Sequence, residues 1–209
     1  MWAADRTRTW VLLEGASDVA AIRALRAARG VMPEDEPCVL VAMGGATNIR
    51  RHVAALAATA VAGRPPPLRV VGLCDEREAP YFVRALEAHR HALGLPFTPT
   101  LETLPDLGFQ ICRRDLEDEL MRALGVDGTR TVLEDLGLGP AFEAFTRQVA
   151  WQGRPVLDQL RRFGTTTSGR KELLAGALAG AVAIDSTPPP LAALLASMPV
   201  RQGVSDPSV

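Results

Sequence analysis

In the first half of the chain, short apolar runs alternate with longer segments of helical periodicity. Residues 10–13 are all apolar, which is typical of a strand buried on both faces of a parallel sheet. Apolar positions then recur at helical spacing as far as Arg29, and Gly30 is a plausible stop. Further strands are expected at 39–43, 69–74 and 109–112, and further helices at 48–61 and 81–93. This alternation predicts an α/β fold with a four-stranded parallel sheet flanked by helices.

From residue 115 onward the pattern is helical. Helices are expected at 115–124, 129–136, 140–150, 154–163, 168–183 and 191–197. We interpret the chain as an α/β core over residues 9–120, a C-terminal helical subdomain packed on it over 121–200, and a disordered tail over 201–209.

The composition and net charge indicate how this protein could bind a nucleic acid or another polyanion. The chain has 209 residues, 47% of them hydrophobic and 22% charged, which suits a globular protein with a real core. Its formal net charge is -1, so it lacks the overall basic excess typical of many nucleic-acid-binding proteins. A site for a polyanion must therefore be a local patch, or must work through bound metal.

The cysteines and the apolar segments indicate a cytoplasmic protein. Cys38, Cys74 and Cys112 lie far apart in apolar runs without a CxxC motif, so we expect small core residues rather than a zinc site or disulfides. The first nine residues contain no long apolar run, and residues 173–184 are too short to span a bilayer. We therefore expect no membrane association.

Acidic residues follow the expected strands directly. Glu14 ends the first strand and Asp18 follows in the first helical turn, while Gly44 and Gly45 follow the second strand. Because ligands gather beyond the carboxyl ends of parallel strands, these residues are expected to meet at one rim of the sheet. The alternative is a solvated charge at a strand end, with Ser17 as the N-cap and Asp18 as a first-turn acid.

The third strand ends in a crowd of acids. Asp75, Glu76 and Glu78 fall within four residues, so they raise one another's pKa unless a cation compensates. A divalent ion with oxygen ligands would do so. The alternative is a charged loop partly neutralised by Arg77.

Two further polar segments lie in the helical half. Residues 115–119 carry four acids, which could be metal ligands or the solvated start of a helix. The preceding Arg113 could pair with these acids or with a phosphate. Residues 164–171 are rich in glycine and hydroxyl groups, but Arg170 follows the second glycine where a P-loop requires lysine. What remains is a phosphate site with Lys171 as a point charge, or ordinary helix capping.

In this order, the motifs resemble the TOPRIM domains of OLD-family nucleases. The resemblance extends from about residue 9 to residue 185 if Gly169-Arg170-Lys171 matches the C-terminal lysine segment of that family. The matching segments are Val11-Leu12-Leu13-Glu14-Gly15-Ala16-Ser17-Asp18, Gly44-Gly45, Gly72-Leu73-Cys74-Asp75 and Asp115-Leu116-Glu117-Asp118-Glu119-Leu120.

The resemblance implies a role for each matching residue. Glu14 and Asp18 would bind or position Mg²⁺ or Mn²⁺, and Glu14 could also transfer a proton. Asp75 would be the first acid of a DxD element. Glu117 would be a further metal ligand, in the helix after the fourth strand. Lys171 would stabilise charge on the scissile phosphate. The second DxD acid is replaced by Arg77, and Glu78 is the candidate substitute. Candidates for contacting the substrate are Gly44, Gly45, Arg113 and Arg170.

Two functions follow from these residues and the resemblance. The first is metal-dependent phosphodiester hydrolysis on nucleic acid, with DNA expected, as in a nuclease or nicking enzyme. The second is a catalytically weak TOPRIM module that binds nucleic acid or docks onto a separate ATPase partner. Arg77 in place of an acid favours the second, and the full set of other acids with Lys171 favours the first.

Overall fold

The sheet and its flanking helices match the architecture expected from the sequence. The computed structural model describes residues 9–61, 69–165 and 169–200. Within these residues a four-stranded parallel sheet has the order β2-β1-β3-β4. Its strands are β1 (Thr9–Leu13), β2 (Val39–Ala42), β3 (Arg69–Asp75) and β4 (Phe109–Cys112). The predicted α/β fold class is confirmed.

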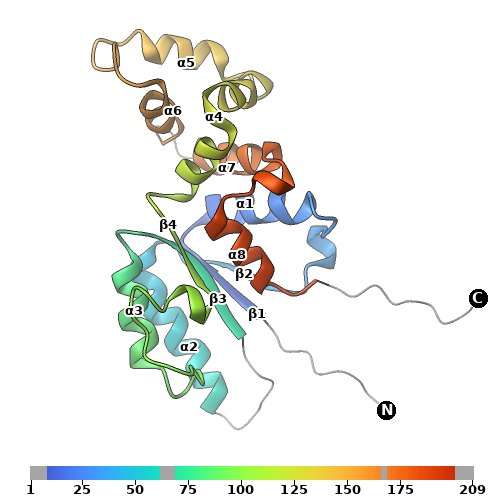
Figure 1. Cartoon of the computed structure of the whole chain (residues 1–209), viewed down its shortest axis with the longest axis vertical. Coiled ribbons are helices and arrows are strands. Elements are labelled where there is room, and N and C mark those ends of the chain that lie inside the picture. Colours follow the sequence, from blue (N-terminus) through green and yellow to red (C-terminus); the bar gives the residue numbers. More distant parts are fainter. Residues whose placement is uncertain (1–8, 62–68, 166–168, 201–209) are drawn as a thin grey trace, which may run out of the picture.

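Helices cover both faces of the sheet (Figure 1). On one face lie α2 (Ile49–Val61) and α3 (Ala79–Ala88), which pack against each other. On the other face lie α1 (Ala16–Ala27) and α8 (Pro189–Ser197), and α7 (Arg170–Ala181) packs over α1. Two hydrophobic clusters result, one on each face, with Leu12 and Phe109 in one and Val11 and Leu13 in the other. Alternate residues of β1 thus enter opposite clusters, which is the period of a strand buried on both faces.

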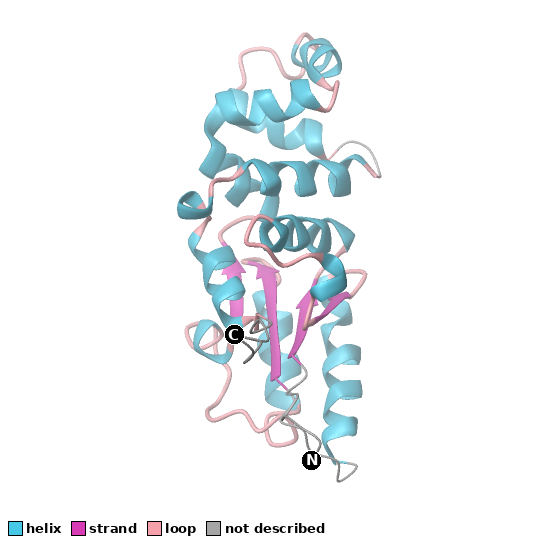
Figure 2. Ribbon diagram, turned by 90° about the vertical axis from the view of Figure 1, so that its right-hand side faces the viewer, coloured by secondary structure: helices cyan, strands magenta, loops and turns pink. Residues whose placement is uncertain are grey.

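The helical half forms an arm beyond the carboxyl ends of the strands. It consists of α4 (Leu116–Asp135), α5 (Gly139–Thr146) and α6 (Val156–Gly164). In Figure 2 the strand arrows point toward this arm. The aromatic core of the arm joins Phe142 and Phe163 edge to face, with centroids 5.4 Å apart.

Several predicted boundaries are wrong. The two helices expected at 115–124 and 129–136 are present within α4, which breaks at Gly125, whose φ of 69° and ψ of -177° are not helical; the second helix begins directly after that residue rather than at 129. The helix expected to reach residue 93 ends at Ala88, and that expected to reach residue 150 ends at Thr146. In both cases the apolar pattern continues into turns, which periodicity alone does not separate from helix.

Other expectations fall differently. Cys38, Cys74 and Cys112 are buried and free, as predicted. The domain boundary at residue 120 lies within α4, and the division into core and helical subdomain remains a prediction. The tail, 201–209, lies outside the described residues. Among the described helices, none combines the length and the apolar character needed to cross a bilayer.

Candidate metal and phosphate site

The neighbouring strands β1 and β3 provide the first two site residues. The helix after β1 lies on one face of the sheet, whereas the helix after β3 lies on the other, so the chain diverges between these strands (Figure 1). Such a switch point leaves a crevice at the carboxyl ends of the strands. Glu14 follows β1 directly and Asp75 ends β3. The Asp75 backbone N–H donates a hydrogen bond to Glu14 Oε1 at 2.9 Å, which holds the Glu14 side chain at this point.

A turn brings a third carboxylate back to the same place. The Glu78 N–H donates to the Asp75 carbonyl oxygen at 2.9 Å, and this folds residues 75–78 against the end of β3. One carboxylate oxygen from each of Glu14, Asp75 and Glu78 then lies within 4.8 Å of the other two. These three acids could hold one cation.

Further residues surround these acids. With Glu14 and Asp75, but without Glu78, they line a hollow of about 210 Å³, which we call the acidic hollow. Its lining residues come from the ends of β1 and β3, the loop after β2, and the starts of α1, α4 and α7: Glu14, Gly15, Ser17, Asp18, Gly44, Gly45, Asp75, Glu117 and Lys171.

Asp18 lines the acidic hollow and also caps the start of α1. Its Oδ2 accepts a hydrogen bond from the Gly15 N–H at 2.8 Å, so it caps the start of α1. The N-cap itself is Gly15 and the helix begins at Ala16, so the interpretation of Ser17 as the N-cap is wrong. Asp18 can bind a ligand with the carboxylate oxygen that the cap leaves available.

The glycine pair after β2 provides the opposite wall. Gly44 and Gly45 have φ values of 75° and 118°, in the region that other residues adopt with strain. Asn48 donates to the Gly44 carbonyl oxygen at 3.0 Å, and the Gly45 N–H donates to the Glu14 carbonyl oxygen at 2.8 Å. The loop is therefore fastened to the strand that carries Glu14.

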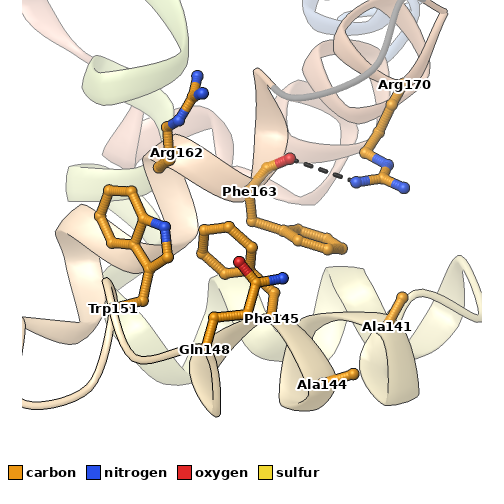
Figure 3. A pocket seen from close by; sticks show the side chains of 8 residues that line it. All are labelled: Ala141, Ala144, Phe145, Gln148, Trp151, Arg162, Phe163 and Arg170. Atoms are coloured by element: carbon orange, nitrogen blue, oxygen red, sulfur yellow. Dashed lines mark hydrogen bonds between the residues drawn. The ribbon is translucent and has the colours of Figure 1, made fainter.

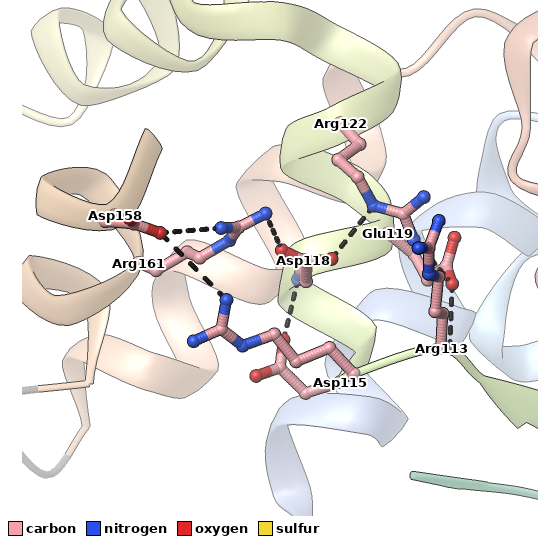
Figure 4. A network of polar contacts seen from close by, with 8 residues as sticks. Arg113, Asp115, Asp118, Glu119, Arg122, Asp158 and Arg161 are labelled. Atoms are coloured by element: carbon pink, nitrogen blue, oxygen red, sulfur yellow. Dashed lines mark hydrogen bonds and ion pairs between the residues drawn. The ribbon is translucent and has the colours of Figure 1, made fainter. Parts of the chain in front are cut away.

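The acidic start of α4 is divided between two environments. Asp115 is the N-cap and accepts from the Asp118 N–H at 2.7 Å. Glu117, Asp118 and Glu119 are all buried, so the alternative of a solvated helix start is wrong. Glu117 faces the acidic hollow, whereas arginines bind its two neighbours: Arg122 contacts both Asp118 and Glu119, and Arg161 pairs with Asp118 (Figure 4).

Lys171 reaches the acidic hollow from the first turn of α7. Its Nζ lies 3.4 Å from Glu117 Oε1, and its side chain is 48% exposed, so a bound ligand could reach it. Burial by itself lowers the pKa of Lys171, but the carboxylates of Glu117, Asp18 and Asp75 outweigh this and raise it. The ammonium group is therefore charged at neutral pH.

The carboxyl groups of the acidic hollow are hard to ionise without a cation. Burial, and then the neighbouring acids Asp115, Asp18, Glu117 and Glu78, raise the pKa of Asp75 to about 7. Burial, and then a hydrogen bond with Glu78, raise the pKa of Glu14 to about 9. Burial also raises the pKa of Asp18 and of Glu117, against the opposing charge of Lys171 and, for Asp18, the backbone hydrogen bond from Gly15. A cation is the natural compensation for such a group of acids.

Two candidate substrate contacts lie elsewhere. Arg113 lines a separate hollow of about 440 Å³ beside Arg77, Arg114, Arg122 and Arg161, which we call the arginine hollow. Arg170 stacks over Phe163, 4.4 Å from the ring centroid, and lines a hollow in the helical arm (Figure 3). Neither residue lines the acidic hollow, although the sequence suggests both as neighbours of the acids. Arg77 also lines the arginine hollow, whereas Asp75 lines the acidic hollow.

Sequence reasoning missed the arginine and tryptophan side chains of α6 and the loop before it. Arg154, Arg161 and Arg162, with Trp151, line a further hollow of about 520 Å³ that also includes Glu117. The pair Arg161-Arg162 directly precedes the glycine- and hydroxyl-rich loop 164–171, and this was the feature of the sequence that could have indicated a basic surface there. These two side chains could not be placed near the carboxyl ends of the strands, because the local sequence does not indicate where α6 packs.

Known structures share this fold. The C-terminal region of the OLD protein of Xanthomonas campestris pv. campestris is 19% identical, with a TM-score of 0.59, over 91% of this chain and 93% of that one. The C-terminal region of the Burkholderia pseudomallei OLD protein is also 19% identical, with a TM-score of 0.60, over 91% of this chain and 96% of that one. No family model matches the sequence, and no curated protein does. These similarities establish the fold.

Proposed function

We propose that this protein is an OLD-type TOPRIM nuclease or nicking enzyme that hydrolyses phosphodiester bonds in nucleic acid, DNA in particular, with Mg²⁺ or Mn²⁺. The observation that carries the proposal is the meeting of carboxylate oxygens of Glu14, Asp75 and Glu78 within 4.8 Å, where Glu14 and Asp75 also line a hollow together with Lys171. Carboxylates opposed to one cationic side chain suit a metal-bound phosphate. The shared fold with OLD C-terminal regions supports the same family.

The donor set of the acidic hollow fits a hard divalent ion. Mg²⁺ and Mn²⁺ prefer oxygen ligands, and the three clustered carboxylates supply them. Among the described residues, Glu78 Oε2 is a buried oxygen without a hydrogen-bond donor, although buried acceptors normally have one, and Glu117 Oε1 is buried with the Lys171 ammonium group 3.4 Å away. Glu14, Asp75 and Glu78 would hold the ion, with Asp18 and Glu117 at its margin. When bound, such an ion polarises the phosphate and lowers the pKa of water.

The side chains have distinct duties in this scheme. Lys171, opposite the carboxylates, would offset the negative charge that develops on the phosphate during the reaction. Glu14 is fixed by the Asp75 N–H through Oε1, which leaves Oε2 to accept or return a proton. The Gly44-Gly45 loop has no side chain beyond Cα, so it lets a nucleic-acid backbone approach the acids closely.

One observation favours a second function. The position of the second DxD acid holds Arg77, whose side chain lines the arginine hollow rather than the acidic hollow. With one acid fewer, the domain would be a catalytically weak module that binds nucleic acid or docks onto a separate ATPase partner. Under either function we expect the protein to act in the cytoplasm.

Plasmid cleavage separates the two functions. We expect the purified protein to convert supercoiled plasmid to nicked or linear DNA with Mn²⁺ or Mg²⁺, and to leave it intact with EDTA, because the acids need a cation to act on a phosphate. Agarose electrophoresis over time measures the conversion. Intact plasmid with both ions, from protein that still binds DNA, would contradict hydrolysis and favour the weak binding module.

A further inference from the structure

The acidic hollow continues into the helical arm. The hollow of about 520 Å³, which we call the central hollow, shares Glu117 with the acidic hollow. It shares Arg114 and Arg161 with the arginine hollow. It also shares Trp151 and Arg162 with the hollow of about 380 Å³ in the arm, which we call the aromatic hollow. These shared residues place the hollows next to one another, from the acids to the arm.

Arginines that are not needed by the fold line this surface. The Arg114 side chain is 59% exposed, and Nη1 lies 4.0 Å from Asp158 Oδ1, so that pair is loose. Within the described residues, neither Arg154 nor Arg162 forms an ion pair, and both are exposed. Arg161 differs, because it is held between Asp118 and Asp158 (Figure 4). Arg154 contacts the Trp151 ring, which accepts none of the hydrogen bonds that a phosphate would. Arg114, Arg154 and Arg162 can therefore still bind an anionic ligand such as a phosphate.

Flat aromatic surface lies beside these arginines. Trp151 stacks on Phe145 with centroids 5.1 Å apart and an angle of 30° between the rings. Phe163 lies 5.7 Å from Phe145, and Figure 3 shows these rings in the aromatic hollow with Arg162 and Arg170 above them. Trp151 is half-buried and lines the central hollow, and the Arg154 guanidinium lies over its ring, 5.9 Å from the centroid. A base that stacks on Trp151 therefore shares the ring with Arg154 or displaces it.

Arginines along a groove together with an accessible aromatic ring match the chemistry of single-stranded nucleic acid. Such a strand offers both a phosphate backbone and unstacked base faces, and base stacking on an aromatic side chain contributes about 1–3 kcal/mol per base. A duplex offers the same phosphates but keeps its base faces inside the stack, so Trp151 would add nothing to its binding.

We infer that the helical arm binds a single-stranded segment of nucleic acid, with phosphates on Arg114, Arg154 and Arg162 and a base against Trp151. The strand then leads past Glu117 into the acidic hollow. This inference rests on the proposed function for what happens to the strand at the acids. Binding on the arm requires no cleavage, so the two can be tested separately.

Fluorescence anisotropy in EDTA, where no cleavage is expected, tests the inference. The probes are a fluorescein-labelled oligothymidine and a duplex of the same length. We expect the wild-type protein to bind the single strand more tightly than the duplex, and Trp151→Ala to weaken single-strand binding by about 5- to 150-fold while affecting the duplex little. Arg154→Ala with Arg162→Ala should lower the slope of log affinity against log salt by about 1 for each phosphate that the arm no longer binds.

Two control variants test whether a loss of affinity comes only from the lost positive charge or from disruption of the arm. Arg147→Ala removes the same charge from an exposed position on the same arm, outside the four hollows, and should bind like the wild type. Trp151→Phe keeps an aromatic ring against Phe145, so it should preserve the arm and restore most of the affinity. Circular dichroism reports whether Trp151→Ala is folded.

The outcomes distinguish this inference from the proposed function. Equal affinity for duplex and single strand, equal loss in Arg147→Ala, or binding that is indifferent to Trp151→Ala would overturn it. Indifference to every arm substitution would instead mark this face as a surface for a protein partner. Arm-dependent binding by a protein that fails to cut plasmid with Mn²⁺ would support the inference and contradict hydrolysis.

Discussion

The Asp75→Ala variant is expected to lose metal-dependent cleavage entirely while remaining folded and at least as stable as the wild type. Asp75 contributes one of the three clustered carboxylates, so its loss removes a cation ligand and should lower plasmid conversion to the EDTA background. Its backbone N–H, which holds Glu14, is retained in alanine. Loss of one acid also relieves repulsion from Asp18, Asp115 and Glu117.

The stability gain in Asp75→Ala should depend on pH. The pKa of Asp75 is raised to about 7 in the folded metal-free protein, above its ordinary value, so the folded state holds the proton more tightly than the unfolded state does. Wild-type stability therefore falls as pH rises from about 4 to about 7, and the variant lacks this loss. Urea unfolding in EDTA at either end of that interval measures the difference.

A matched control separates site chemistry from simple loss of charge. Asp106→Ala removes an exposed carboxylate at the opposite end of the sheet and should leave both cleavage and its pH dependence unchanged. Full cleavage by pure Asp75→Ala protein would show that another site, or a contaminating nuclease, cuts the DNA.

The Lys171→Met variant is expected to fold normally but to cleave about 10²–10³ times more slowly. A transition-state charge partner contributes on this scale, whereas partly exposed substitutions usually change the free energy of unfolding by no more than about 0.5 kcal/mol. The side chain is 48% exposed and lies 3.4 Å from Glu117, so its loss leaves no cavity in the core. Single-turnover cleavage, compared with thermal unfolding, measures both effects.

Arg23→Met provides the control for Lys171→Met. Arg23 is an exposed cation on α1, the helix against which α7 packs, and it does not line the acidic hollow. Its replacement removes the same charge and should leave the cleavage rate unchanged. A normal rate in Lys171→Met would assign Lys171 to helix capping or to neutralising Glu117.

The sheet could be predicted because its strands are short and apolar, and the first three are followed by or end in glycine or an acid. In the strand 109–112 the predicted and observed residues agree, and Glu14 and Asp75 could be placed at one rim because parallel strands share a direction. Glu78 could be proposed as a substitute acid because a turn after β3 allows it to fold back.

The helices of the arm and the break near Gly125 could be predicted from periodicity, but the packing of the arm could not. Glu117 faces the acidic hollow, whereas Asp118 and Glu119 bind arginines. This difference depends on one arginine in α4 itself and on another in α6, which is distant in sequence. Arg113 and Arg170 lie near the acids or Lys171 in sequence, but their side chains face other hollows.

The most direct test of the account is to locate Mn²⁺ by its anomalous scattering in crystals of the protein grown with that ion. The account predicts a peak between Glu14, Asp75 and Glu78, with carboxylate oxygens at about 2.0–2.6 Å from the metal. Crystals of Asp75→Ala grown in the same way should lack it. Wild-type crystals with no peak among these carboxylates, or with Mn²⁺ bound at another group of acids, would contradict the account.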